Sequence, residues 1–103
     1  MTMHVAVAYT EGCPHREIAE VRVREALDRL GHSNVEINLL AIESDEQAHR
    51  MGFRGSPTVF VDGVDLFDDP SAAVGLSCRL YRTPEGLAGS PTVDHVIAAL
   101  QQS

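Results

Sequence analysis

The N-terminal segment 3–30 constrains the fold most, because a strand pattern there is followed at once by a helix pattern. Residues 3–9 are rich in valine and small apolar residues and predict a strand. After a turn at 10–12, apolar residues recur from Pro14 to Leu30 at the spacing of an amphipathic helix packed on a sheet. Pro14 suits the first helical turn, where no N–H is needed. We therefore expect a strand–turn–helix unit with Cys13 at the helix N-terminus.

The rest of the chain continues this alternation. We predict strands at 35–39, 59–61 and 78–81, a short helix from the capping box at Ser44 to Gly52, and a last helix beginning at Ser90 and Pro91. Strands joined by a helix run parallel through a right-handed crossover, and the last two strands can pair antiparallel. The expected structure is one domain over 1–103. It is a three-layer α/β fold, β-α-β-α-β-β-α, with a mixed four-stranded sheet.

Charge and composition argue against several classes of partner and cofactor. The net charge of −7 disfavours a nucleic-acid surface, which needs clustered cations. No apolar run is long enough to span a bilayer, so we expect no membrane partner and a cytoplasmic location. In a reducing compartment Cys13 and Cys78 are expected to be thiols rather than a structural disulfide. With these two thiols and no nearby His pair, we expect no metal site and no cofactor.

Cys13 is the main candidate for chemistry. A thiol at a helix N-terminus faces unpaired N–H groups and the positive end of the helix dipole, which favour the thiolate. The spacing is that of a Cys-x-x-Cys redox motif, but the last position is Arg16, so no local disulfide can close. Turnover would need Cys78 as a distant resolving thiol, or an external thiol such as glutathione. The alternative is a thiol retained by descent on a fold that has lost its chemistry.

The element order, with Cys13 after the first strand and Ser56-Pro57-Thr58 before the third, resembles the thioredoxin fold in its short, glutaredoxin-sized form. This resemblance implies that Pro57 follows a cis peptide bond and lies against the cysteine. It also implies that the Ser56 backbone binds an extended substrate segment by strand addition.

Two narrower likenesses accompany it. Cys13-Pro14-His15 is similar to the Cys-Pro-His-Cys motif of strongly oxidising bacterial thiol oxidases, apart from Arg16. Segment 75–84 resembles small thioredoxin-like proteins sometimes labelled alkylmercury-lyase-related. The activity of the lyase is not carried over, because that enzyme also uses an aspartate and none lies near Cys13 in the sequence.

Several other residues are candidates for the site, each with a structural alternative. Arg16 would bind the thiolate or an anionic substrate, or pair with Glu20 on the surface. His15 would tune Cys13 or shuttle protons, or be an exposed first-turn residue. Tyr9 would line the cleft or pack in the core. We expect Cys78 to be a buried core thiol on the fourth strand, with the resolving role as its alternative.

The acidic stretch from Asp62 to Asp69 does not match a calcium loop, because the required spacing and terminal Glu are absent. We expect it to be a solvated loop anchored by Leu66 and Phe67, with a partner surface as the alternative.

Three hypotheses of function remain open on the sequence. The first is a single-cysteine, thioredoxin-like thiol protein in which Cys13 attacks a disulfide, peroxide or electrophile, with Ser56, Pro57 and Thr58 positioning the substrate. Its partners would be a disulfide-bearing protein, glutathione or a small electrophile. The second is binding of a soft metal or organomercurial by Cys13, with or without Cys78. The third is a non-catalytic interaction module on the same fold.

Overall fold

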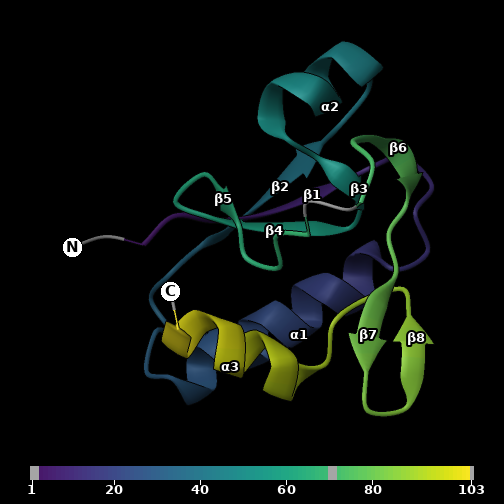
Figure 1. The fold of residues 1–103 in the computed structure, drawn as a ribbon. Helices are drawn as coiled ribbons and strands as arrows, with labels where there is room; N and C mark the ends of the chain where they lie inside the picture. The colour runs from purple at the N-terminus through teal and green to yellow at the C-terminus, as the bar shows by residue number, and fades with distance from the viewer. Residues whose placement is uncertain (1–2, 70–71, 103) are drawn as a thin grey trace.

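A mixed four-stranded sheet lies between helices on its two faces (Figure 1). The computed structural model describes residues 3–69 and 72–102. In the sheet order β2-β1-β4-β5, β1 is parallel to β2 and antiparallel to β4, and β4 is antiparallel to β5. The strands are β1 (Val5–Tyr9), β2 (Ile37–Ala41), β4 (Thr58–Val61) and β5 (Val64–Asp65). The mixed four-stranded sheet predicted from the sequence is thus confirmed.

Two hydrophobic cores fill the spaces on either side of the sheet. Helices α1 (Arg16–Arg29) and α3 (Val93–Gln102) cover one face, and α2 (Asp45–Met51) covers the other (Figure 1). On the first side, strand valines such as Val7 and Val59 pack with Leu27 of α1 and Val96 of α3. The smaller second core contains Ala8, Ile42, Ala48, Phe53 and Phe60.

The helix starts differ from the prediction at two places. Helix α1 begins at Arg16 rather than Pro14, because the turn closed by the Cys13 N–H on the Thr10 carbonyl (3.1 Å) delays the first helical residue. Helix α3 begins at Val93, where Thr92 Oγ1 accepts from the His95 N–H at 3.1 Å. The predicted cap, Ser90, instead accepts a hydrogen bond from Arg22. The capping box of α2 is confirmed, since Ser44 Oγ accepts from the Gln47 N–H.

The prediction of the fourth strand was wrong. Asp62 and Gly63 both have positive φ, at 53° and 82°, and form a two-residue turn. This turn returns the chain at once as β5, which pairs with β4. The predicted strand at 78–81 is divided instead. Its first residue ends β6 (Gly75–Cys78), and its last residue begins β7 (Tyr81–Thr83).

The residues after β5 form two small sheets beside the main one. Strand β6 pairs in parallel with β3 (Arg54–Ser56), and β7 pairs antiparallel with β8 (Gly86–Ala88). Among the described residues, no helix is both long and apolar enough to cross a membrane.

Candidate functional site

Cys13 lies in the turn that connects β1 to α1, and Pro14 separates it from the N-cap residue His15. Cys13 is partly exposed, and its thiol is not part of a disulfide. Because α1 begins at Arg16, the structure places Cys13 before the helix rather than at its N-terminus, where the sequence predicted it. The sequence prediction of a strand–cysteine–helix junction is otherwise confirmed.

The cysteine turn is attached to the end of β3. The Thr10 N–H donates a hydrogen bond to Ser56 Oγ at 3.0 Å, although the two residues are far apart in sequence. The Ser56–Pro57 peptide bond is cis, as the family resemblance implied. A hydrogen bond therefore connects the turn that contains Cys13 to the Ser56–Pro57 segment.

The side chains of Arg16 and His15, which follow Cys13 in the sequence, pack against other residues of the protein. The Arg16 guanidinium lies over the Tyr9 ring, 4.8 Å from its centroid, and 3.8 Å from the Glu17 carboxylate. The His15 ring lies against Gly89, since a Cβ built on that glycine would come within 2.3 Å of His15 Cδ2. Of the two alternatives for Arg16, the surface pair with Glu20 is not what the structure shows: Arg16 stacks on Tyr9 and pairs with Glu17.

Strand β6 is paired with the edge of β3 beside this region. In the parallel register Ser56 lies opposite Cys78, and the Ser56 carbonyl accepts from the Arg79 N–H at 2.9 Å. The Ser56 side chain is itself buried and bonded to Thr10. The Ser56 carbonyl is therefore already paired with the segment that follows β6.

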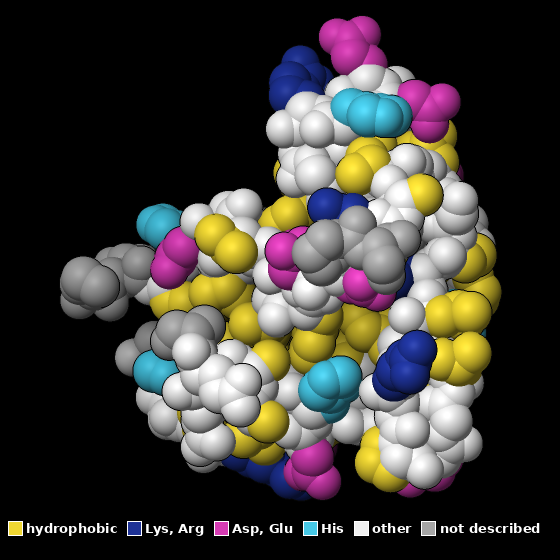
Figure 2. All heavy atoms as spheres, in the orientation of Figure 1, with side chains coloured by type: hydrophobic (Ala, Val, Ile, Leu, Met, Phe, Trp, Pro, Cys, Tyr) yellow, Lys and Arg dark blue, Asp and Glu magenta, His cyan; other side chains and the backbone are white. Residues whose placement is uncertain are grey.

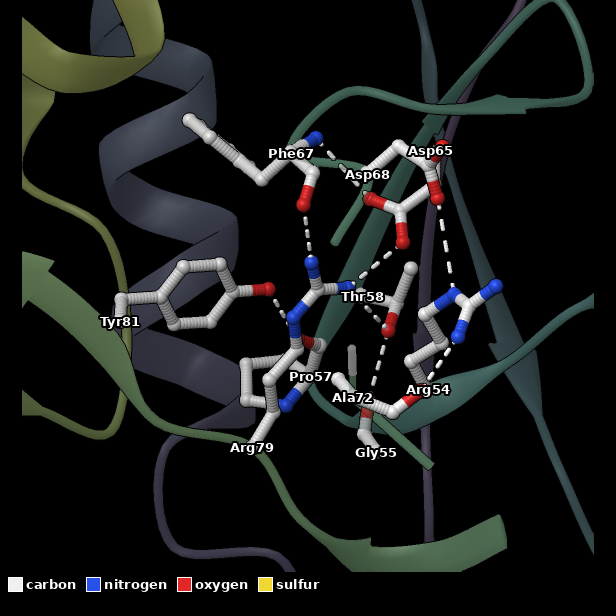
Figure 3. Close-up of polar contacts among 10 residues, drawn as sticks. All are labelled: Arg54, Gly55, Pro57, Thr58, Asp65, Phe67, Asp68, Ala72, Arg79 and Tyr81. Atoms are coloured by element: carbon white, nitrogen blue, oxygen red, sulfur yellow. Dashed lines mark hydrogen bonds and ion pairs between the residues drawn. The ribbon is translucent and has the colours of Figure 1, made fainter. Parts of the chain in front are cut away.

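A buried polar network holds the segment after β6 in place (Figure 3). The Arg79 guanidinium pairs with Asp65 at 2.7 Å, where the two side chains are 5% and 7% exposed. It also donates to Thr58 Oγ1 at 3.1 Å and to the Phe67 carbonyl. Thr58 donates in turn to the Gly55 carbonyl at 2.6 Å. The polar atoms of Thr58 are thus used within the protein.

The amino-acid sequence does not predict this network. Asp65 was expected in a solvated loop, which is wrong, because its carboxylate is buried against Arg79. The sequence does contain one indication of it, the Asp62-Gly63 pair, which is typical of a two-residue hairpin turn. Such a turn pairs the next strand with β4 and so places Asp65 beside it. The matching arginine lies in a segment without clear periodicity, and the sequence has no local feature that pairs the two.

Tyr81 connects β7 to the same region. Its hydroxyl donates to the Pro57 carbonyl, and its ring meets the Phe67 ring edge-on, with centroids 5.4 Å apart. Burial raises the pKa of the Tyr81 phenol above its ordinary range, the nearby Arg79 lowers it, and negative charge on Asp65 and Cys13 raises it.

The raised pKa of Tyr81 predicts an alkaline unfolding transition. The folded protein holds the phenolic proton more tightly than the unfolded chain, so this stability is complete below the unfolded pKa of about 10 and is lost as pH rises above it. In a Tyr9→Phe variant, Tyr81 is the remaining tyrosine. We expect its ultraviolet ionisation signal to coincide with loss of the far-ultraviolet circular dichroism. Ionisation well before unfolding would contradict the burial of Tyr81.

Cys78 is exposed at the end of β6, so the prediction of a buried core thiol on the fourth strand was wrong. The reason is that β6 pairs with β3 in a separate two-stranded sheet and not in the main sheet, so Cys78 is not part of the core. Leucines of β6, of β8 and of the link between β6 and β7 are exposed too, and Figure 2 shows hydrophobic side chains along the side of the molecule where these strands lie. They are Leu76, Leu80 and Leu87.

A cleft of about 620 Å³ is lined by residues after β5, by residues of β6, β7 and β8, and by His95 of α3. Cys78 is one of its lining residues. Figure 2 shows a hollow near the centre of the view with hydrophobic side chains at its base. The cleft also reaches Tyr81 and His95, whereas Cys13 does not line it. Over residues 3–69 and 72–102, no group of three or more His, Cys, Asp or Glu side chains could hold a metal ion.

Comparison with known proteins adds one likeness at low similarity. Neither a protein-family model nor a curated protein matches the sequence. A solved structure described as that of a malarial protein is similar over 99% of this chain and 97% of its own, with a TM-score of 0.49 and 12% sequence identity. A likeness of this degree carries no conclusion about function.

Proposed function

We propose that this chain is a thioredoxin-like thiol protein in which Cys13 acts as a single reactive cysteine. The observation that carries the proposal is the joint position of Cys13 and Ser56. The cysteine is in the turn between β1 and α1, and the hydrogen bond from Thr10 to Ser56 attaches that turn to the segment containing Pro57. A partly exposed thiol in a turn fixed by long-range contacts suits attack on a small region of a substrate.

The arrangement of elements supports the thioredoxin-like part of the proposal. The first strand lies inside the sheet, parallel to β2 and antiparallel to β4, with helices on both faces. Cys13 follows β1, and Ser56-Pro57-Thr58 joins β3 to β4. These are the features on which the resemblance in the sequence rests.

The proposed chemistry is thiol–disulfide exchange with an external resolving thiol. The Cys13 thiolate attacks one sulfur of a disulfide, a new S–S bond forms at Cys13, and the other sulfur leaves as a thiolate. A second external thiol then attacks the mixed disulfide and releases Cys13. Arg16 stacks on Tyr9 at the start of α1, where a Cys-x-x-Cys protein would carry its local resolving thiol.

The test compares two single substitutions after treatment with glutathione disulfide. Wild-type protein and Cys78→Ser should each gain glutathione on Cys13, seen by intact mass and peptide mapping, whereas Cys13→Ser reports how much the exposed Cys78 gains by itself. Circular dichroism would check that each variant is folded. A loss of two hydrogens mapped to Cys13 and Cys78 would replace the single-cysteine mechanism with a two-cysteine one. An unmodified Cys13 would overturn the proposal.

A further inference from the structure

We propose that β6 and the residues after it permanently close the strand edge beside Cys13, so that Cys13 reacts with small disulfides rather than with extended polypeptides. This inference rests on the proposed function of Cys13 and names the substrate class of the same site.

Recognition of an extended polypeptide by strand addition needs free backbone N–H and C=O groups along a sheet edge. The edge attached to the turn that contains Cys13 is that of β3, because Ser56 at its end accepts a hydrogen bond from the Thr10 N–H. Strand β6 already pairs with this edge. The Gly75 N–H donates to the Phe53 carbonyl at 3.1 Å, and the Arg79 N–H donates to the Ser56 carbonyl at 2.9 Å.

The pairing of β6 is held by buried anchors just after the strand. Arg79 is bonded to Asp65, Thr58 and Phe67, and Tyr81 donates to the Pro57 carbonyl. Displacing β6 would pull a buried guanidinium away from its carboxylate, which is costly because both charges would be left unpaired. A polypeptide that competes for the β3 edge therefore has to break this network first.

Close contacts at Gly55 and Gly89 leave little room for an extended polypeptide beside Cys13. A Cβ on Gly55 would lie 3.0 Å from Arg79 Cβ and from the Ser77 carbonyl oxygen, so β3 and the end of β6 are in direct contact. On the helix side, His15 lies against Gly89, which follows β8. Cys13 is still partly exposed, so a compact molecule can reach the thiol without pairing along a strand.

The test measures two probes with the same reactive group. One is glutathione carrying a thionitrobenzoate mixed disulfide, and the other is an extended decapeptide with the same group on a central cysteine. In each reaction the Cys13 thiolate forms a disulfide with the probe and thionitrobenzoate leaves as a coloured thiolate. The protein carries Cys78→Ser so that Cys13 is the remaining thiol. The same protein unfolded in urea reports the intrinsic reactivity of the two probes.

We expect folded protein to prefer the glutathione probe by at least about tenfold over the peptide, after division by the ratio in urea. Equal normalised rates, with Cys13 still reactive, would overturn the closed-edge inference and leave the proposed function standing. No reaction of folded Cys13 with either probe would overturn both. A preference for the peptide would show that β6 yields its position to a substrate.

Discussion

Replacing Arg79 by Met should lower the free energy of unfolding by about 3–5 kcal/mol, because it leaves a buried carboxylate without its partner. The Arg79 and Asp65 side chains are 5% and 7% exposed, so water cannot replace the lost guanidinium. The same substitution removes donors to Thr58 Oγ1 and to the Phe67 carbonyl. Urea unfolding followed by circular dichroism measures the change.

The matched control is Arg29→Met on the solvent face of α1. Arg29 pairs with Glu25 at 3.1 Å, but these side chains are 57% and 49% exposed, so the expected loss is at most about 1 kcal/mol. Adding Asp65→Leu to Arg79→Met should restore part of the lost stability, because no unpaired charge then stays buried. An Arg79→Met variant as stable as Arg29→Met would contradict the buried network.

Replacing Gly55 by Ala should destabilise the protein by about 2–5 kcal/mol through backbone strain and crowding together. Gly55 has φ +112°, a conformation that residues with a Cβ rarely adopt. An added Cβ would also lie 3.0 Å from Arg79 Cβ and the Ser77 carbonyl oxygen, which belong to the end of the β6 segment. The lost stability would therefore come from the contact between β3 and the end of the β6 segment.

Gly75→Ala is the control for this substitution, because Gly75 pairs in the same ladder and a Cβ there meets nothing within 4 Å. Its free energy of unfolding should stay within about 0.5 kcal/mol of the wild type. If Gly55→Ala is equally mild, the close approach of β3 and β6 is wrong. In a Gly55→Ala variant that is still folded, the preference of Cys13 for the small probe should fall.

The regular elements could be predicted because their patterns are local. The apolar spacing of α1 and the Ser44 cap of α2 each specify a structure within one segment. Strand β5 and the strands after it are short, with two to four residues each, and such lengths carry too few positions to show a period. Their partners are chosen by turn geometry and by burial of distant groups.

The candidate site likewise has features that the sequence predicts and features that depend on tertiary structure. The sequence alone determined that one cysteine follows the first strand and precedes a helix, and that Arg16 takes the place of a second thiol nearby. Tertiary structure alone decided that Cys78 is exposed, that Arg79 is buried against Asp65 and that β6 covers the Ser56 edge. The spacing of apolar residues within one segment shows which face of that helix or strand is buried. The pairing of distant segments depends on desolvation and strand register, which arise only when those segments meet.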